Sequence, residues 1–152
     1  MIFFGANDAC LTGNAQHVPL DEYSEALKTL CQHPSVVAHS PKIMLITPPP
    51  VNEYQFPMVN AHGDNFAVMR TAQNTRHYAQ ACTQVASDLK LPVVDLWNDF
   101  MCHVGWRGEE PLPGSRQAPP NELLNTLFVD GQPSINVLSP CLHLSSTLTD
   151  KP

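Results

Sequence analysis

Met1-Ile2-Phe3-Phe4-Gly5-Ala6-Asn7-Asp8 opens the sequence, and this stretch carries the main evidence for the fold. Four apolar residues followed by a glycine are typical of a short buried strand that ends in a tight turn. Two further apolar runs, at 43–47 and 91–95, have the same character. Segments with helical spacing separate the three runs, and this alternation predicts a parallel sheet. We therefore expect an α/β fold with about three parallel strands, buried on both faces.

Amphipathic helices are expected between these strands. The first lies between Pro19 and Pro34, where apolar residues recur at helical spacing: Leu20, Tyr23, Leu27, Leu30 and Cys31. Pro19 is expected at its first helical position. The second runs over roughly 66–89, and its buried stripe is expected to be Tyr78, Cys82, Val85, Ala86 and Leu89. A short helix is expected over 96–102. Within the proline-rich segment 105–140, only 122–129 resembles an ordered element.

The composition excludes several classes of function. Lys and Arg number 8 against 14 Asp and Glu, so the net charge of −6 argues against nucleic-acid binding, which needs a basic surface. No apolar run approaches the ~18 residues that span a bilayer, and the start of the chain lacks the basic segment of a signal peptide. The five cysteines form no CxxC pair, which favours a reducing compartment and hence the cytoplasm. The composition predicts no particular oligomeric state.

Polar residues follow the predicted strands, where ligands bind in open parallel sheets. Asn7 comes after the first strand, and its amide N–H is a suitable donor to an oxyanion. The alternative is that Asn7 and Asp8 only cap a turn. For Asp95, at the end of the third strand, we favour the N-cap of the following helix over a catalytic acid. Asp130 and His143 are a carboxylate and an imidazole too far apart in sequence to form a local motif.

The seven histidines raise the alternative of a small metal-binding protein. Their nearest clusters are His62-Gly63-Asp64, Cys31-Gln32-His33 and Cys102-His103. None has the spacing of a structural zinc site or of an HxxxH helix, so scattered surface histidines are the favoured interpretation. Cys82 lies on the predicted buried stripe and is expected to be a small core residue.

Gly5-Ala6-Asn7-Asp8 resembles the third conserved block, GxND, of the SGNH (GDSL-type) ester hydrolases. The nearest match is to the isoamyl acetate-hydrolysing esterases, and especially to their fungal members. The segments that resemble this group occur in its order, at 3–9, 16–23, 45–50, 78–82 and 94–97, with 105–106 and 111–115 resembling its fungal members. The resemblance covers residues 1 to about 131 and resumes at 142–145.

This resemblance implies an incomplete three-layer αβα fold of flavodoxin-like type, with a partial hydrolase domain over 1–146 and a short tail over 147–152. It also implies a serine-ester mechanism on small acetate-type esters, without a metal or an organic cofactor. Matched to the pattern of the family, Asn7 is the oxyanion donor, Asp130 the orienting acid and His143 the general base.

Three departures from the family pattern bear on activity. The GDS block with the nucleophile precedes the third block in the family, and none of the nine serines here has a GDS context. Ser115 lies in a proline-rich loop and is not expected to replace it. In the family the histidine stands three positions after the acid, but position 133, three after Asp130, is Pro133, and removing 132–141 would restore Asp-Gly-Leu-His. We interpret 132–141 as an insertion. The closing helix that follows the histidine in the family is also missing.

We therefore expect a fragment of a serine-type carboxylic ester hydrolase that is inactive by itself. The alternative is a non-catalytic pseudo-esterase that acts as a binding or partner-interacting module. Without the first strands of the family, residues 1–4 should form an exposed apolar sheet edge, which is a template for association.

Overall fold

Three short parallel strands form a sheet in the order β1-β2-β3 in the computed structural model, which describes residues 1–55, 69–129 and 132–133. The strands are β1 (Ile2–Phe3), β2 (Leu45–Ile46) and β3 (Val93–Val94). Ile2 pairs with Leu45, and Leu45 pairs with Val93. The predicted α/β fold with about three parallel strands is confirmed, although the paired segments are shorter than the apolar runs.

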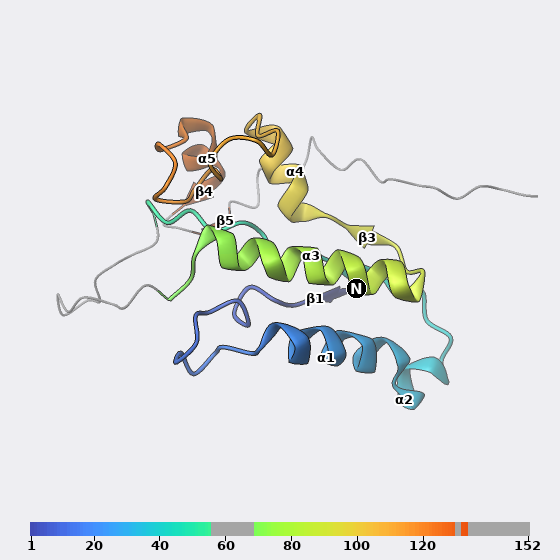
Figure 1. Cartoon of the computed structure of the whole chain (residues 1–152). Helices are drawn as coiled ribbons and strands as arrows, with labels where there is room; N and C mark the ends of the chain where they lie inside the picture. Colours follow the sequence, from blue (N-terminus) through green and yellow to red (C-terminus); the bar gives the residue numbers. More distant parts are fainter. Residues whose placement is uncertain (56–68, 130–131, 134–152) are drawn as a thin grey trace, which may run out of the picture.

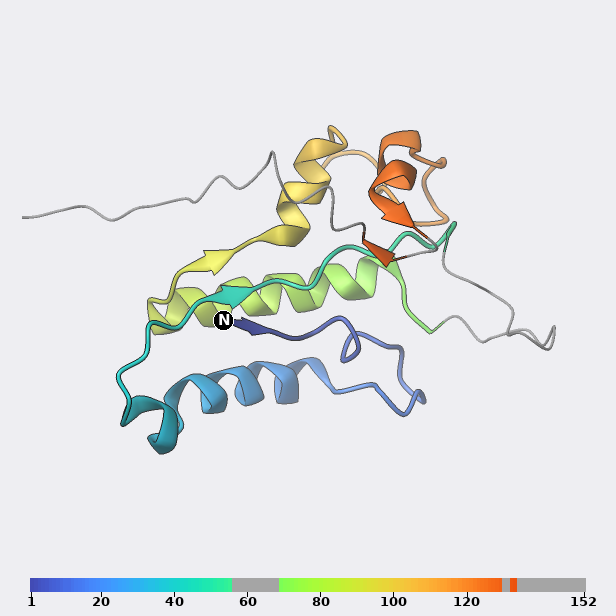
Figure 2. The ribbon, with the colours of Figure 1, turned by 180° about the vertical axis from the view of Figure 1, so that it is seen from behind.

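Two helices cover one face of this sheet. α1 (Leu20–Gln32) follows β1 and leads into the short α2 (Pro34–Val37), and α3 (Ala72–Leu89) connects β2 to β3. Both views show α1 and α3 side by side, with α3 between α1 and the later helices (Figures 1 and 2). This arrangement is the one expected when each strand is joined to a parallel neighbour through a helix.

The starts of both long helices differ from the sequence prediction. Pro19 is the N-cap of α1, with a ψ angle of 145°, and not its first helical residue. α3 begins at Ala72 because the side-chain oxygen of Thr71 accepts a hydrogen bond from the backbone N–H of Asn74, at 3.1 Å. A threonine in this position satisfies an N–H that the first helical turn leaves without a partner.

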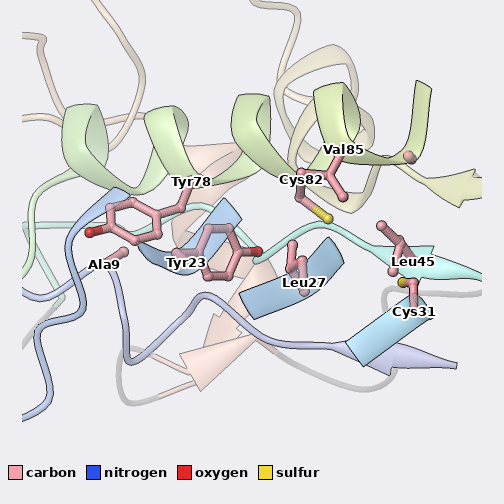
Figure 3. Packing of buried hydrophobic residues seen from close by; sticks show 9 residues of the cluster. Ala9, Tyr23, Leu27, Cys31, Leu45, Tyr78, Cys82 and Val85 are labelled. Atoms are coloured by element: carbon pink, nitrogen blue, oxygen red, sulfur yellow. The ribbon is translucent and has the colours of Figure 1, made fainter. Parts of the chain in front are cut away.

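The main core lies between the sheet and the helices α1 and α3 (Figure 3). Its buried residues are Ala9, Tyr23, Leu27, Cys31, Leu45, Tyr78, Cys82, Val85 and Ala86. The Tyr23 and Tyr78 rings lie 5.2 Å apart between centroids and are tilted, a favourable aromatic arrangement. The prediction that Cys82 is a core residue is confirmed. Leu20 and Leu30 stay 39% and 44% exposed, because they lie at the start of α1 and at the edge of its buried stripe.

A second core joins α3 to the C-terminal elements. α4 (Leu96–His103) follows β3, and α5 (Glu122–Leu127) precedes β4 (Phe128–Val129), as expected for 96–102 and 122–129. β4 pairs antiparallel with β5 (Gln132–Pro133). The buried residues of this core are Ala72, Ala79, Trp97, Phe100, Met101, Leu112, Leu124, Leu127 and Phe128.

The two faces of β1 are covered differently. Ile2 packs against the main core, but Phe3 is 51% exposed and Phe4 is 56% exposed. The expected burial of the strands on both faces is therefore wrong at β1 within the described residues, where α1 and α3 cover one face only. β1 is an edge strand with exposed apolar side chains, as expected for residues 1–4. Within the described ranges, no helix is long and apolar enough to cross a membrane.

Candidate active site

The candidate site lies where the three parallel strands end. The turn 5–8 follows β1, Thr47 follows β2 and Asp95 follows β3. Because the strands are parallel, these three carboxyl ends meet at one edge of the sheet, which is where α/β folds bind ligands.

The turn after β1 is fixed by a hydrogen bond within the turn and by the close approach of α1. Gly5 has a φ of +110°, a backbone conformation that side chains rarely adopt. Its N–H donates to a carboxylate oxygen of Asp8 at 2.9 Å, so Asp8 has the turn-capping role that the sequence left open for it. A Cβ on Gly5 would lie 2.8 Å from the Tyr23 hydroxyl and 3.1 Å from Cγ of Pro48. Only glycine fits this turn.

Asn7 is exposed, and its side chain is bound by a residue that the sequence analysis missed. Its Oδ1 accepts a hydrogen bond of 2.6 Å from Nη2 of Arg70. A guanidinium carries only donors, so the carbonyl end of the amide faces Arg70 and the NH₂ end remains the donor. The oxyanion role predicted for Asn7 is compatible with this geometry and stays a prediction. No local pattern points to Arg70, which lies 63 positions away in the sequence.

α3 and the residues before it hold the rest of this loop. Nδ2 of Asn74 donates to the carbonyl oxygen of Ala9 at 2.7 Å, and the Tyr78 hydroxyl donates to the carbonyl oxygen of Val18. The backbone N–H of Leu11 donates to the carbonyl oxygen of Met69 at 2.7 Å. The loop that carries Asn7 is therefore fixed at several backbone positions.

The ends of β2 and β3 are joined through Thr47. This buried side chain donates to Oδ1 of Asp95 at 3.2 Å and accepts from the N–H of Trp97 at 3.0 Å. Oδ1 of Asp95 also accepts from the N–H of Asn98 at 3.2 Å. The prediction that Asp95 caps the helix is confirmed. Asp95 thus stabilises the start of α4.

A polar cluster ties the segment after β2 to the C-terminal part of the chain. The carboxylate of Glu53 accepts from the N–H groups of Ala72 and Arg116, at 2.8 and 3.1 Å. Nearby, Nδ2 of Asn52 donates to Oδ1 of Asn125 at 2.8 Å. Ser115 is almost fully buried, and its hydroxyl oxygen accepts from the N–H of Gln117 at 3.2 Å. This bond gives Ser115 a structural role in its turn.

Several sequence-predicted residues fall outside the described ranges. Asp130 and His143 are among them, as is the cluster His62-Gly63-Asp64. Of the segment interpreted as an insertion, 132–133 forms β5, while 134–141 is not described, so that interpretation remains a prediction. In the described part of the chain, no three His, Cys, Asp or Glu residues are grouped so that they could hold a metal ion.

The described cysteines are all free thiols. Cys10, Cys31 and Cys82 are buried, and Cys102 is exposed. Burial raises the pKa of the Cys82 thiol to about 11, so this group stays protonated at neutral pH. A protonated, buried thiol is a poor nucleophile, which excludes Cys82 as the nucleophile of the candidate site.

Comparison with known proteins places the chain in a family. The sequence profile of the GDSL-like lipase/acylhydrolase family matches residues 1–131, and the chain belongs to this family. The resemblance to SGNH (GDSL-type) hydrolases predicted from the sequence is thus confirmed.

Two relatives compared by sequence agree with this assignment. The chain is 37% identical over 125 residues to the GDSL esterase/lipase At5g62930 of Arabidopsis thaliana, covering 78% of this chain and 52% of that protein. It is 41% identical over 105 residues to the isoamyl acetate-hydrolyzing esterase 1 homolog of Mus musculus, covering 63% and 39%. A lipase/acylhydrolase crystal structure from Enterococcus faecalis is 25% identical with a TM-score of 0.48, over 66% of this chain and 42% of that one. The chain spans about half the length, or less, of these relatives.

Proposed function

We propose that this chain forms the oxyanion-binding half of the active site of a carboxylic ester hydrolase that acts on small, acetate-type esters. The supporting observation is the Asn7 amide, which follows β1 at the ligand-binding edge of the sheet with its oxygen bound by Arg70. The NH₂ end of this amide is available to donate to the carbonyl oxygen of an ester.

The chemistry of ester hydrolysis explains the need for such a donor. Attack on the ester carbonyl produces a tetrahedral oxyanion, and a fixed N–H donor stabilises this charge more than it stabilises the bound ester. In the proposed site His143 takes the proton of the attacking hydroxyl, and Asp130 orients its imidazole. The names of the relatives, which include isoamyl acetate-hydrolyzing esterase homologs, support a small ester as the substrate.

The nucleophile of the proposed site is the serine of a GDS block. No Gly-Asp-Ser occurs in the sequence, so this serine has to come from a segment outside it. The reaction uses a hydroxyl, an imidazole, a carboxylate and amide donors, and the proposal includes no cofactor.

A chimeric protein tests the proposal. The GDS-containing segment of the Mus musculus relative is joined to Met1, residues 132–141 are removed so that His143 stands three positions after Asp130, and hydrolysis of p-nitrophenyl acetate is compared with that of the chain alone. We expect activity in the chimera only. Asn7→Ala in the chimera should lower kcat by about 10²–10³-fold, the usual effect of removing one oxyanion donor.

Asn98→Ala is the matched control, because Asn98 is an exposed asparagine whose backbone, and not its side chain, contacts Asp95. It should leave kcat unchanged. A chimera that folds with native circular dichroism but does not hydrolyse the ester would refute the proposed function, as would full activity of the Asn7→Ala chimera.

A second candidate function is a non-catalytic pseudo-esterase that binds a partner or a ligand. The absence of a GDS context around all nine serines favours it. Sequencing of the full-length transcript separates the two: a GDS-coding exon joined to the codon of Met1 supports the hydrolase, and a message without one supports the pseudo-esterase.

A further inference from the structure

We infer that Arg70 is a positioning residue for Asn7, which fixes the end of the Asn7 amide that faces the ester and strengthens its N–H groups as donors. This inference rests on the proposed function, because the oxyanion role of Asn7 gives the orientation its importance. Arg70 does not itself contact the ester in this proposal.

Arg70 reaches three side chains of the segment that follows β1. Its Nη2 donates to Oδ1 of Asn7 at 2.6 Å and to Oε1 of Gln16 at 3.3 Å, and its Nε donates to Sγ of Cys10 at 3.3 Å. The bond to Asn7 is the shortest of the three. Gln16 and Cys10 hold the guanidinium in place. It therefore presents a fixed N–H to Asn7.

The chemistry of the guanidinium determines the orientation of the amide. An asparagine side chain has an acceptor end and a donor end of nearly equal size, and in water an exposed amide adopts both orientations. Opposite Arg70, the reversed orientation would place NH₂ against N–H and lose the bond. The positive charge of the Arg70 guanidinium beside Oδ1 also draws electron density from the amide nitrogen of Asn7. This makes the N–H groups of the amide stronger donors.

This role can be separated from a merely structural one. The backbone of the same loop is also held by Asn74 at Ala9, by Met69 at Leu11 and by the Asp8 carboxylate at Gly5. Loss of the Arg70 side chain should therefore leave the path of the loop intact and release the Asn7 amide. Loss of the Asn74 side chain should loosen the loop and leave the Asn7 amide bound to Arg70.

Nuclear magnetic resonance of the full chain in dilute solution tests the inference. The side-chain ¹⁵N–¹H₂ signals of Asn7 are identified by their disappearance in Asn7→Ala. Arg70→Met should shift both of these signals, and Arg70→Lys should restore part of the shift. Asn74→Ala is the control for loop stability: it should lower the melting temperature and leave the Asn7 side-chain signals nearly in place.

The active chimera provides a kinetic test. Arg70→Met should lower kcat and leave KM unchanged, because the orientation of Asn7 matters most in the transition state. The loss should not exceed the about 10²–10³-fold expected for removal of Asn7 itself. Arg70→Lys should recover part of it, and Arg107→Met, at an exposed arginine in the loop after α4, should leave kcat unchanged.

The outcomes distinguish the inference from the proposed function. Unshifted Asn7 signals in Arg70→Met, or equal shifts in Asn74→Ala, would overturn the inference even if the chimera is active. An inactive chimera would overturn the proposed function, and the Asn7 signals would still decide whether Arg70 orients the amide. Full kcat of Arg70→Met in an active chimera would show that the orientation has no catalytic effect.

Discussion

The hydroxyl of Tyr23 lies 2.8 Å from the position that a Cβ on residue 5 would occupy, and it donates a hydrogen bond of 3.2 Å to the carbonyl oxygen of Phe4. Through this contact α1 determines the course of the chain at the end of β1. The turn that presents Asn7 therefore depends on a side chain from a different element.

Gly5→Ala should destabilise the fold by about 1–3 kcal/mol, because the φ of +110° strains an alanine and its Cβ meets the Tyr23 hydroxyl. Gly13→Ala is the matched control, since Gly13 has a φ of +94° with nothing within 4 Å of a Cβ, and it measures the backbone strain alone. Urea denaturation should show a larger loss for Gly5→Ala, reduced in Gly5→Ala/Tyr23→Phe. Equal losses at the two glycines would contradict the steric argument.

Thr47→Val should lower the free energy of unfolding by about 1–3 kcal/mol, because the buried N–H of Trp97 loses its acceptor and Asp95 loses a donor. Thr47→Ser keeps the hydroxyl and should retain most of this stability. Chemical denaturation of the three proteins measures the difference. If valine is tolerated as well as serine, the hydroxyl does not hold the ends of β2 and β3 together.

Stability should decrease in alkaline solution because of buried groups in the main core. Burial raises the pKa of Cys82 from 9.0 to about 11 and also raises the pKa of Tyr23 above its ordinary value. Between pH 9 and 11 the folded chain keeps the Cys82 proton that the unfolded chain has released. The folded state then binds more protons, so the free energy of unfolding falls as the pH rises.

Urea denaturation from pH 8 to 11 measures this slope, which Cys82→Ala should make shallower. Cys102→Ala is the control, because Cys102 is exposed and should leave the slope unchanged. A slope that is the same in wild type and Cys82→Ala would mean that Cys82 does not contribute to the alkaline loss of stability.

The exposed edge of β1 should cause the chain to associate as its concentration rises. Phe3→Lys places a charge on this edge and should reduce association, as measured by light scattering across micromolar concentrations. Leu123→Lys is the comparison, because Leu123 is 52% exposed against 51% for Phe3 but lies on α5. A wild-type chain that stays monomeric, or an equal effect of both lysines, would argue against association through β1.

Local patterns were sufficient for the elements and for most of the main core. The alternation of apolar runs and helical stripes predicted β1, β2, β3, α1, α3 and α4, since burial of one face requires a period that is visible in the sequence. Helical spacing predicts a start of α3 about six residues too early, because the capping bond of Thr71 decides the start and apolar spacing does not. The two-sided burial of β1 was wrong, because the cover of a strand depends on its neighbours.

The sequence by itself determined the order of strands and helices, the GxND turn with Asn7 at the end of the first strand, and the family. Only the tertiary structure decided what each polar group in the site does. Arg70 reaches Asn7 across 63 positions, and Thr47 reaches Asp95 across 48. The physical reason is that periodicity records which face of an element is buried, whereas a hydrogen-bond partner is chosen by the packing of elements that are distant in the chain.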